Sequence, residues 1–90
     1  MKVLKFSADW CSPCHMMKPI VKEVASELDV EVVEINTDEA SDTTRRYGIR
    51  SIPTLVFVSD EGTEIGRVTG VTSKENLLSK MKEALGGSKD

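Results

Sequence analysis

The chain has 90 residues, of which 39% are hydrophobic and 30% charged, and it carries a net charge of −3. This size limits it to one small domain, expected to be monomeric. The mild acidity, without a basic stripe interleaved with aromatic residues, argues against nucleic acid as a partner. The sequence contains no run of about 18 apolar residues, the length that a membrane span requires, and no recognisable signal peptide. We therefore expect a cytoplasmic protein.

The first half of the sequence predicts a strand, a long helix and a second strand. Residues Val3–Phe6 form the first short strand, and helical periodicity then runs from about Pro13 to Leu28, with Pro19 expected to kink the helix. The apolar stripe of that helix consists of Met17, Ile20, Val21, Val24 and Leu28. The β-branched segment Val30–Asn36 predicts a second strand, parallel to the first because a crossover helix joins them.

The middle of the chain predicts a short helix and a hairpin. The helix lies between Asp42, an N-cap candidate, and Gly48, a C′ candidate. The buried strand Pro53–Val58 follows. A turn in which Gly62 supplies the positive φ then leads into the antiparallel strand Glu64–Gly70.

The last helix opens with Thr72 and Glu75 as a capping box and ends at Gly86 and Gly87. Its expected buried residues are Leu77, Leu78, Met81 and Leu85. The element order is therefore βαβαββα, an α/β fold with a four-stranded mixed sheet flanked by three helices. We expect one domain over residues 1–86 and a flexible tail over residues 87–90.

The only two cysteines, Cys11 and Cys14, are separated by two residues in the segment WCSPC, directly after the only tryptophan, Trp10. A disulfide between them closes too short a loop to stabilise the fold much. Cys11 falls where the first strand ends and the long helix begins, where unpaired N–H groups and the helix dipole favour a thiolate. Attack by Cys11 on a disulfide and resolution by Cys14 is then a chemically sensible sequence.

Of three other readings of the cysteine motif, a metal site and haem attachment remain open at this point and a protease pair fails. A structural zinc site needs four ligands, and the chain offers two cysteines and the lone His15. A Cys-His protease pair lacks a partner that would orient His15. The spacing C-x-x-C-H also matches covalent haem attachment, although no second axial ligand stands out.

Several separated motifs, in order, resemble the thioredoxin family. The segment ADWCSPC resembles its A-x-W-C-G-P-C signature, Pro19 matches its helix-kinking proline, and YGIRSIPTLVFV resembles its cis-proline segment. The segment GRVTGV resembles its second hairpin strand, and the match covers Val3 to Leu85.

The resemblance implies a thioredoxin-type protein-disulfide reductase in which Cys11 attacks and Cys14 resolves. It implies that the Ile52–Pro53 peptide bond is cis. It also implies an apolar substrate-binding surface made of Trp10, Pro13, Ile52, Pro53, Gly70 and Val71. For Trp10 and Val71, simple packing is the competing interpretation.

Four departures from the family pattern limit this transfer. The amino-terminal strand and helix of the family have no counterpart, so we expect a shortened version of the fold. Ser12 stands where the motif usually has glycine, and His15 stands where a lysine is usual. The family's buried aspartate, six residues before the first cysteine, and the lysine on the neighbouring strand are replaced by Lys5 and Glu34.

We hypothesise that Lys5 and Glu34 face the same side of adjacent parallel strands as a charge-swapped pair. Such a pair would tune the pKa of Cys14 and relay its proton, since an unpaired buried charge is costly. The competing interpretation is two solvated charges on a face left open by the missing elements.

The favoured function is a cytoplasmic reductase that serves cell redox homeostasis. A flavoprotein thioredoxin reductase would reduce it, it would pass electrons to protein disulfides, and it would bind no cofactor or metal of its own. An oxidising exchange protein or isomerase is an alternative that Ser12 and His15 keep open. A thioredoxin-like binding subunit without a redox role is another. Glutaredoxin is less favoured because its C-P-Y-C motif is absent.

Overall fold

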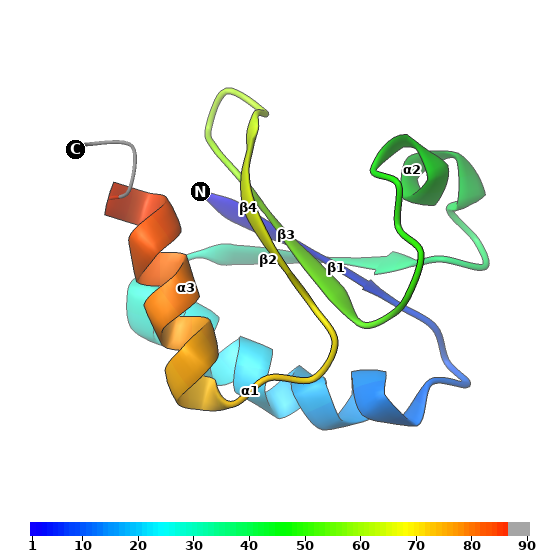
Figure 1. Ribbon diagram of the computed structural model, residues 1–90, viewed down its shortest axis with the longest axis horizontal. Helices are drawn as coiled ribbons and strands as arrows, with labels where there is room; N and C mark the ends of the chain where they lie inside the picture. The colour runs from blue at the N-terminus through cyan, green and yellow to red at the C-terminus, as the bar shows by residue number, and fades with distance from the viewer. Residues whose placement is uncertain (87–90) are drawn as a thin grey trace.

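The computed structural model describes residues 1–86, and the predicted tail at 87–90 lies outside these residues. Within them are four strands and three helices in the predicted order, shown in Figure 1. Their bounds are β1 Lys2–Ser7, α1 Ser12–Leu28, β2 Glu31–Asn36, α2 Ser41–Arg46, β3 Thr54–Val58, β4 Glu64–Thr69 and α3 Lys74–Gly86.

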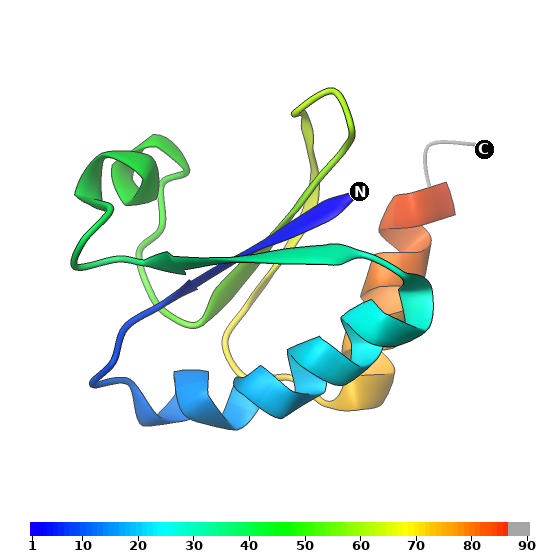
Figure 2. The same ribbon diagram turned by 180° about the vertical axis from the view of Figure 1, so that it is seen from behind.

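The described strands form one mixed sheet in the order β2, β1, β3, β4. β1 pairs in parallel with β2, as expected for strands joined by the crossover helix α1, and antiparallel with β3. β3 and β4 form the predicted antiparallel hairpin, and Gly62 in its turn has a φ of 90°. β2 therefore forms one edge of the sheet and β4 the other, and β2 lies in front in the reversed view of Figure 2. The predicted α/β fold is confirmed.

Side chains alternate between two apolar cores, one on each face of the sheet. The larger core packs α1 and α3 against one face and consists of Val3, Met17, Val21, Val24, Leu55, Phe57, Leu77 and Met81. The smaller core, on the face that carries α2, is built on Leu4, Phe6, Val56 and Val58. Because both faces of β3 are covered, all five of its residues are buried, which explains its continuous apolar sequence.

The helix α1 begins at the cysteine motif. Cys11 is its N-cap, with φ −93° and ψ 103°, and Pro13 lies in the first turn, where a missing N–H costs nothing. Asp29 ends the helix in the left-handed conformation with a φ of 56°. Pro19 lies inside the helix, and the kink expected there stays a prediction.

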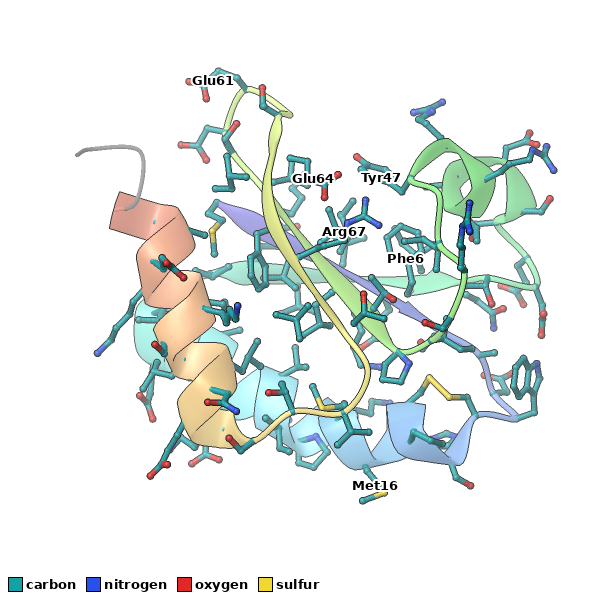
Figure 3. The ribbon with its side chains drawn as sticks, in the orientation of Figure 1. Phe6, Met16, Tyr47, Glu61, Glu64 and Arg67 are labelled. Atoms are coloured by element: carbon teal, nitrogen blue, oxygen red, sulfur yellow. A yellow bond between two sulfur atoms is a disulfide. The ribbon has the colours of Figure 1, made fainter. Side chains whose placement is uncertain are left out.

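The short helix α2 is held to the sheet by an arginine and an aromatic pair. Arg67 of β4 donates to the Tyr47 carbonyl at 2.9 Å and to both carboxylate oxygens of Glu64 at 2.7 and 2.9 Å. The rings of Phe6 and Tyr47 lie 5.7 Å apart between centroids. Figure 3 shows Arg67 beneath Glu64 and beside Tyr47. These contacts fix Tyr47 at the start of the loop that follows α2, and Ile52 later in that loop packs against the cysteines.

Three details of the sequence prediction are wrong. Asp42 is not the N-cap of α2, because Ala40 is; Asp42 lies in the first turn, where its carboxylate accepts from Arg45 at 2.7 Å. The cap of α3 is Ser73 rather than Thr72, since the Ser73 hydroxyl accepts from the Asn76 N–H at 3.1 Å. Leu85, predicted to be buried, is 47% exposed, and Met81, one turn earlier, is the last fully buried residue of α3.

Among residues 1–86, no helix has both the length and the apolar character needed to cross a membrane.

Candidate active site

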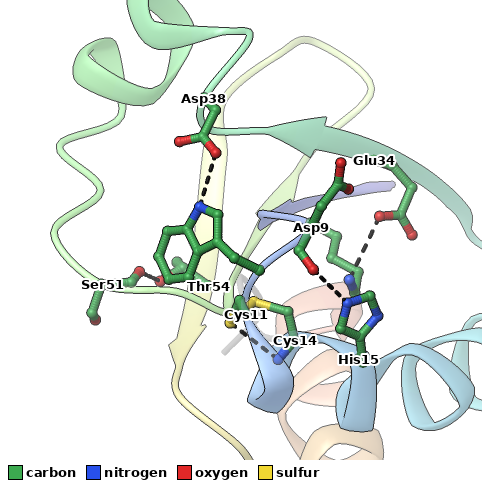
Figure 4. The surroundings of a disulfide bond; sticks show 10 residues. Asp9, Cys11, Cys14, His15, Glu34, Asp38, Ser51 and Thr54 are labelled. Carbon is green, nitrogen blue, oxygen red and sulfur yellow. Dashed lines mark hydrogen bonds and ion pairs between the residues drawn. A yellow bond between two sulfur atoms is a disulfide. The ribbon is translucent and has the colours of Figure 1, made fainter.

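Cys11 and Cys14 form a disulfide at the amino-terminal end of α1, with their Cα atoms 5.3 Å apart (Figure 4). The position follows from local structure, because β1 ends at Ser7, a short turn follows, and Cys11 then starts the helix. Both cysteines are buried, at 4% and 2% exposure. The arrangement supports exchange between a dithiol and a disulfide.

One backbone N–H of the first helical turn points at the sulfur of Cys11. The Cys14 N–H donates to Cys11 Sγ at 3.2 Å, which makes the sulfur itself the side-chain cap of α1. The Cys11 N–H donates to the Ala8 carbonyl at 3.2 Å and fixes the preceding turn. An N–H aimed at sulfur, together with the helix dipole, stabilises negative charge there.

A cis-proline loop lies beside the disulfide. The Ile52–Pro53 peptide bond is cis, as the resemblance implied. The buried Thr54 hydroxyl donates to the Ser51 carbonyl at 2.7 Å, and the Gly70 N–H donates to the Pro53 carbonyl at 2.8 Å. The loop is thereby fixed from both sides, and Ile52 packs against the cluster of Ala8, Cys11 and Cys14.

Trp10 stands over the site with 70% of its surface exposed, so packing does not account for it. Its indole Nε1–H donates to Asp38 Oδ2 at 2.9 Å, an interaction drawn in Figure 4. Asp38 is itself held in a turn, because its N–H donates to the Asn36 side-chain oxygen at 2.9 Å. Asp38 was not predicted from the sequence.

A groove of about 680 Å³ runs between the tryptophan and the cis-proline loop. It is lined by Trp10, Cys11, Ser12, Pro13, Thr37, Thr44, Ile49, Arg50, Ser51 and Ile52. Cys11 is among these residues and Cys14 is not. A substrate lying in the groove would therefore meet the Cys11 sulfur first.

Only some of the residues predicted to form the substrate-binding surface line the groove. Trp10, Pro13 and Ile52 line it together. Pro53 is buried behind it, joined to Gly70 by the backbone hydrogen bond. Val71, which is 51% exposed, follows Gly70 outside the groove, so it is not simply packed away either.

Lys5 and Glu34 are partners in the parallel register of β1 and β2, and Lys5 Nζ lies 3.5 Å from Glu34 Oε1. Their exposures differ sharply, at 3% for the lysine side chain and 53% for the glutamate. Two freely solvated charges, the competing interpretation, are contradicted for Lys5. Glu34 lines a hollow between α1 and β2 rather than the groove beside the sulfurs.

His15 is exposed, and its Nε2 lies 2.8 Å from the Asp9 carbonyl oxygen, so it ties the first turn of α1 to the preceding loop. Within residues 1–86, no three histidine, cysteine or acidic side chains are placed to hold a metal ion. The described site offers sulfur chemistry.

A second unpredicted contact ties the loop after β4 to α1. The Thr72 N–H donates to the Met17 thioether sulfur at 3.4 Å, one helical turn beyond Cys14. The loop that carries Gly70 and Val71 is thus bound both to the cis-proline segment and to the helix of the cysteines. No local sequence signal marks this contact, because it joins residues 55 positions apart.

Residues 1–83 match the family model described as Thioredoxin. A thioredoxin of Synechocystis sp. is 40% identical over 85 residues, covering 92% of this chain and 78% of that relative. A thioredoxin of Chlamydia pneumoniae is 43% identical over 82 residues, covering 87% and 79%. The structure of thioredoxin 1 from Thermosipho africanus matches with a TM-score of 0.84 at 25% identity over 98% of each chain.

Proposed function

The chain belongs to the thioredoxin family, and from this membership we propose that Cys11 attacks the substrate disulfide and Cys14 resolves the intermediate. The protein is a thiol–disulfide oxidoreductase, a protein-disulfide reductase of the thioredoxin type. One observation carries the assignment of roles. Cys11 lines the groove and accepts an N–H at its sulfur, whereas Cys14 lies behind it.

The proposed reaction has two exchange steps. The Cys11 thiolate attacks one sulfur of the substrate disulfide, a mixed disulfide forms, and the other substrate sulfur leaves as a thiolate. The Cys14 thiolate then attacks Cys11 Sγ, which forms the Cys11–Cys14 disulfide and releases the second substrate thiolate. Two electrons pass to the substrate, and the two thiol protons end on its sulfurs. The second step is fast because both thiols belong to one helical turn.

Trapping the intermediate tests this assignment. With a peptide disulfide as substrate, Cys14→Ser should accumulate a mixed disulfide at Cys11, visible as a mass increase. Cys11→Ser and the double variant should accumulate none under the same conditions. An adduct that forms mainly on Cys11→Ser would reverse the two roles.

We further propose that Trp10, Pro13, Ile52, Pro53, Gly70 and Val71 form the substrate-binding surface. Support comes from the exposed indole, held by Asp38 at the wall of the groove. Trp10→Ala should lower kcat/KM for a protein disulfide about tenfold, in the range of an aromatic binding hot spot. Met16→Ala is the matched control, because Met16 is 63% exposed on α1 outside the groove. Equal losses of kcat/KM in Trp10→Ala and Met16→Ala would contradict the assignment of this surface to substrate binding.

For Lys5 and Glu34, we propose a tuning role toward Cys14. The support is the 3.5 Å ion pair between Lys5 on β1, the strand that leads into the cysteine motif, and Glu34 on β2, together with the burial of Lys5. Lys5→Met and Glu34→Gln should change the thiol titration and the reduction rate, and their combination should not add. Strictly additive effects would contradict the coupled pair. The control pair is Lys2 and Glu31, which face each other across the same two strands and are both exposed.

We also propose that the protein is a cytoplasmic monomer and that a flavoprotein reductase is its electron donor. Kinship with thioredoxins supports these assignments. Sedimentation at increasing protein concentration should give one monomeric species. Reduction by NADPH should require a flavoprotein thioredoxin reductase, and a glutathione system that serves equally well would argue against that partner.

A further inference from the structure

The groove beside the disulfide contains a single charged side chain. Of its ten lining residues, all within the described part of the chain, only Arg50 carries a formal charge while Cys11 is in the disulfide. The others are aromatic, aliphatic, sulfur-containing or hydroxyl side chains. Any charge preference for a segment lying in the groove therefore depends first on Arg50.

The guanidinium of Arg50 has no carboxylate partner among residues 1–86. Two other arginines do: Arg45 contacts Asp42 at 2.7 Å, and Arg67 contacts Glu64 at 2.7 Å. Arg50 is exposed and takes part in none of the ion pairs or side-chain hydrogen bonds of the described structure. Its planar fork of N–H donors is thus available to a carboxylate from another molecule.

The carboxylate near the opposite wall does not offset this charge inside the groove. Asp38 is absent from the lining, and its Oδ2 accepts the Trp10 indole N–H at 2.9 Å. The chain as a whole carries a net charge of −3, which repels acidic partners at long range. A preference for acidic segments must therefore come from short-range contact with Arg50.

We propose that Arg50 is a specificity-determining residue that makes this reductase prefer disulfides flanked by acidic residues. The substrate class is an extended polypeptide with Asp or Glu within about three residues of the attacked cysteine. The carboxylate pairs with Arg50 while the cysteine sulfur reaches Cys11. The inference rests on the proposed function, since it requires Cys11 to be the sulfur that meets the substrate.

Matched peptide disulfides test the preference. Each peptide contains one disulfide, and Glu, Gln or Lys is placed in turn at each position within three residues of the cysteine. At the best position, wild-type kcat/KM should be about two- to fivefold higher for Glu than for Gln, as for an exposed ion pair. Lys should be the poorest substrate. The Glu-to-Gln ratio should approach 1 in about 1 M salt, where the screening length falls to about 3 Å.

Variants of Arg50 attribute the ratio to this residue. Arg50→Gln should bring the Glu-to-Gln ratio of kcat/KM to about 1, and Arg50→Lys should keep part of the preference for Glu. Arg50→Glu should reverse the preference, so that the Lys peptide becomes the best substrate and the Glu peptide the poorest. Because each ratio is taken within one variant, a general change in dithiol reactivity cancels. Arg46→Gln is the control, since Arg46 is exposed on α2, outside the groove, and its loss changes the net charge equally.

The outcomes separate this inference from the proposed function. A ratio that survives in Arg50→Gln, or falls equally in Arg46→Gln, overturns the role of Arg50. Equal reduction of acidic, neutral and basic peptides by the wild type also overturns it, while leaving the reductase activity in place. Failure to reduce any of the peptides would contradict the proposed function itself.

Discussion

Removing the carboxylate of Glu34 should destabilise the protein more than removing the ammonium of Lys5. The Lys5 side chain is 3% exposed and that of Glu34 is 53% exposed, with 3.5 Å between the charged atoms. Glu34→Gln leaves a buried cation without its counter-charge. Lys5→Met removes the buried cation, keeps an unbranched apolar chain in its place, and leaves behind a carboxylate that water already reaches.

Coulomb's law bounds the size of the effect. Two charges 3.5 Å apart interact by about 1 kcal/mol in water and about 5 kcal/mol at an effective dielectric constant of about 20. With one buried and one half-exposed member, the loss in Glu34→Gln should be about 2 kcal/mol. Lys5→Met should change the free energy of unfolding by less than about 1 kcal/mol, and the double variant should resemble Lys5→Met.

Urea unfolding of the oxidised protein, followed by Trp10 fluorescence, measures these differences. The exposed pair Lys2 and Glu31 provides the control, and Lys2→Met and Glu31→Gln should each change stability by less than about 0.5 kcal/mol. A larger loss in Lys5→Met than in Glu34→Gln would refute the reasoning, because stability would then depend on the lysine itself rather than on the neutralisation of a buried charge.

Three further predictions concern packing and pH. Gly66→Ala should cost about 1–3 kcal/mol of stability in urea unfolding, because a Cβ at Gly66 would lie 3.1 Å from the ring of the buried Phe57; an unchanged midpoint would show that the ring yields freely. Leu77→Ala should cost about 2–5 kcal/mol, since Leu77 is fully buried between α1, α3 and the sheet; a smaller loss would mean that the core collapses around the cavity. The hydrogen bond from Arg67 lowers the pKa of Glu64 from its ordinary value of 4.5. The stability that this pair contributes is therefore fully present above about pH 4.5, and it is lost as the pH falls through the lowered pKa of Glu64. Arg67→Gln should flatten that acid limb in unfolding experiments between pH 5 and 3, and an unaltered limb would contradict the assignment.

Much of the fold was predictable because hydrophobic period and turn chemistry agree along the chain. The alternation in Glu31–Asn36, the continuous apolar run of Thr54–Val58 and the left-handed Gly48 each carry a local cause. Helix ends were less predictable. Serine and threonine are chemically similar caps, so the choice between Thr72 and Ser73 depended on the hydrogen bond actually made.

The local motif of the candidate site was predictable from the sequence, whereas the contacts between separate segments around it were not. The cysteine pair is a local motif, and the cis bond before Pro53 came from the family resemblance rather than from the residues. Asp38 and Arg50 were missed because their contributions depend on how separate segments meet. Asp38 reaches Trp10 across 28 positions of the chain, and Arg50 enters the groove only once the loop after α2 folds beside the cysteines.

The reduction potential of the Cys11–Cys14 couple tests the reductase assignment most directly. The protein would be equilibrated with defined glutathione buffers, with Trp10 fluorescence reporting the redox state, since its ring stands beside the groove. The account predicts a potential more negative than that of the glutathione pool, where each 30 mV corresponds to about 1.4 kcal/mol between the two forms. A potential clearly more positive than that of the glutathione pool would contradict the claim that the protein donates electrons to substrates, and it would make the protein a disulfide donor or isomerase.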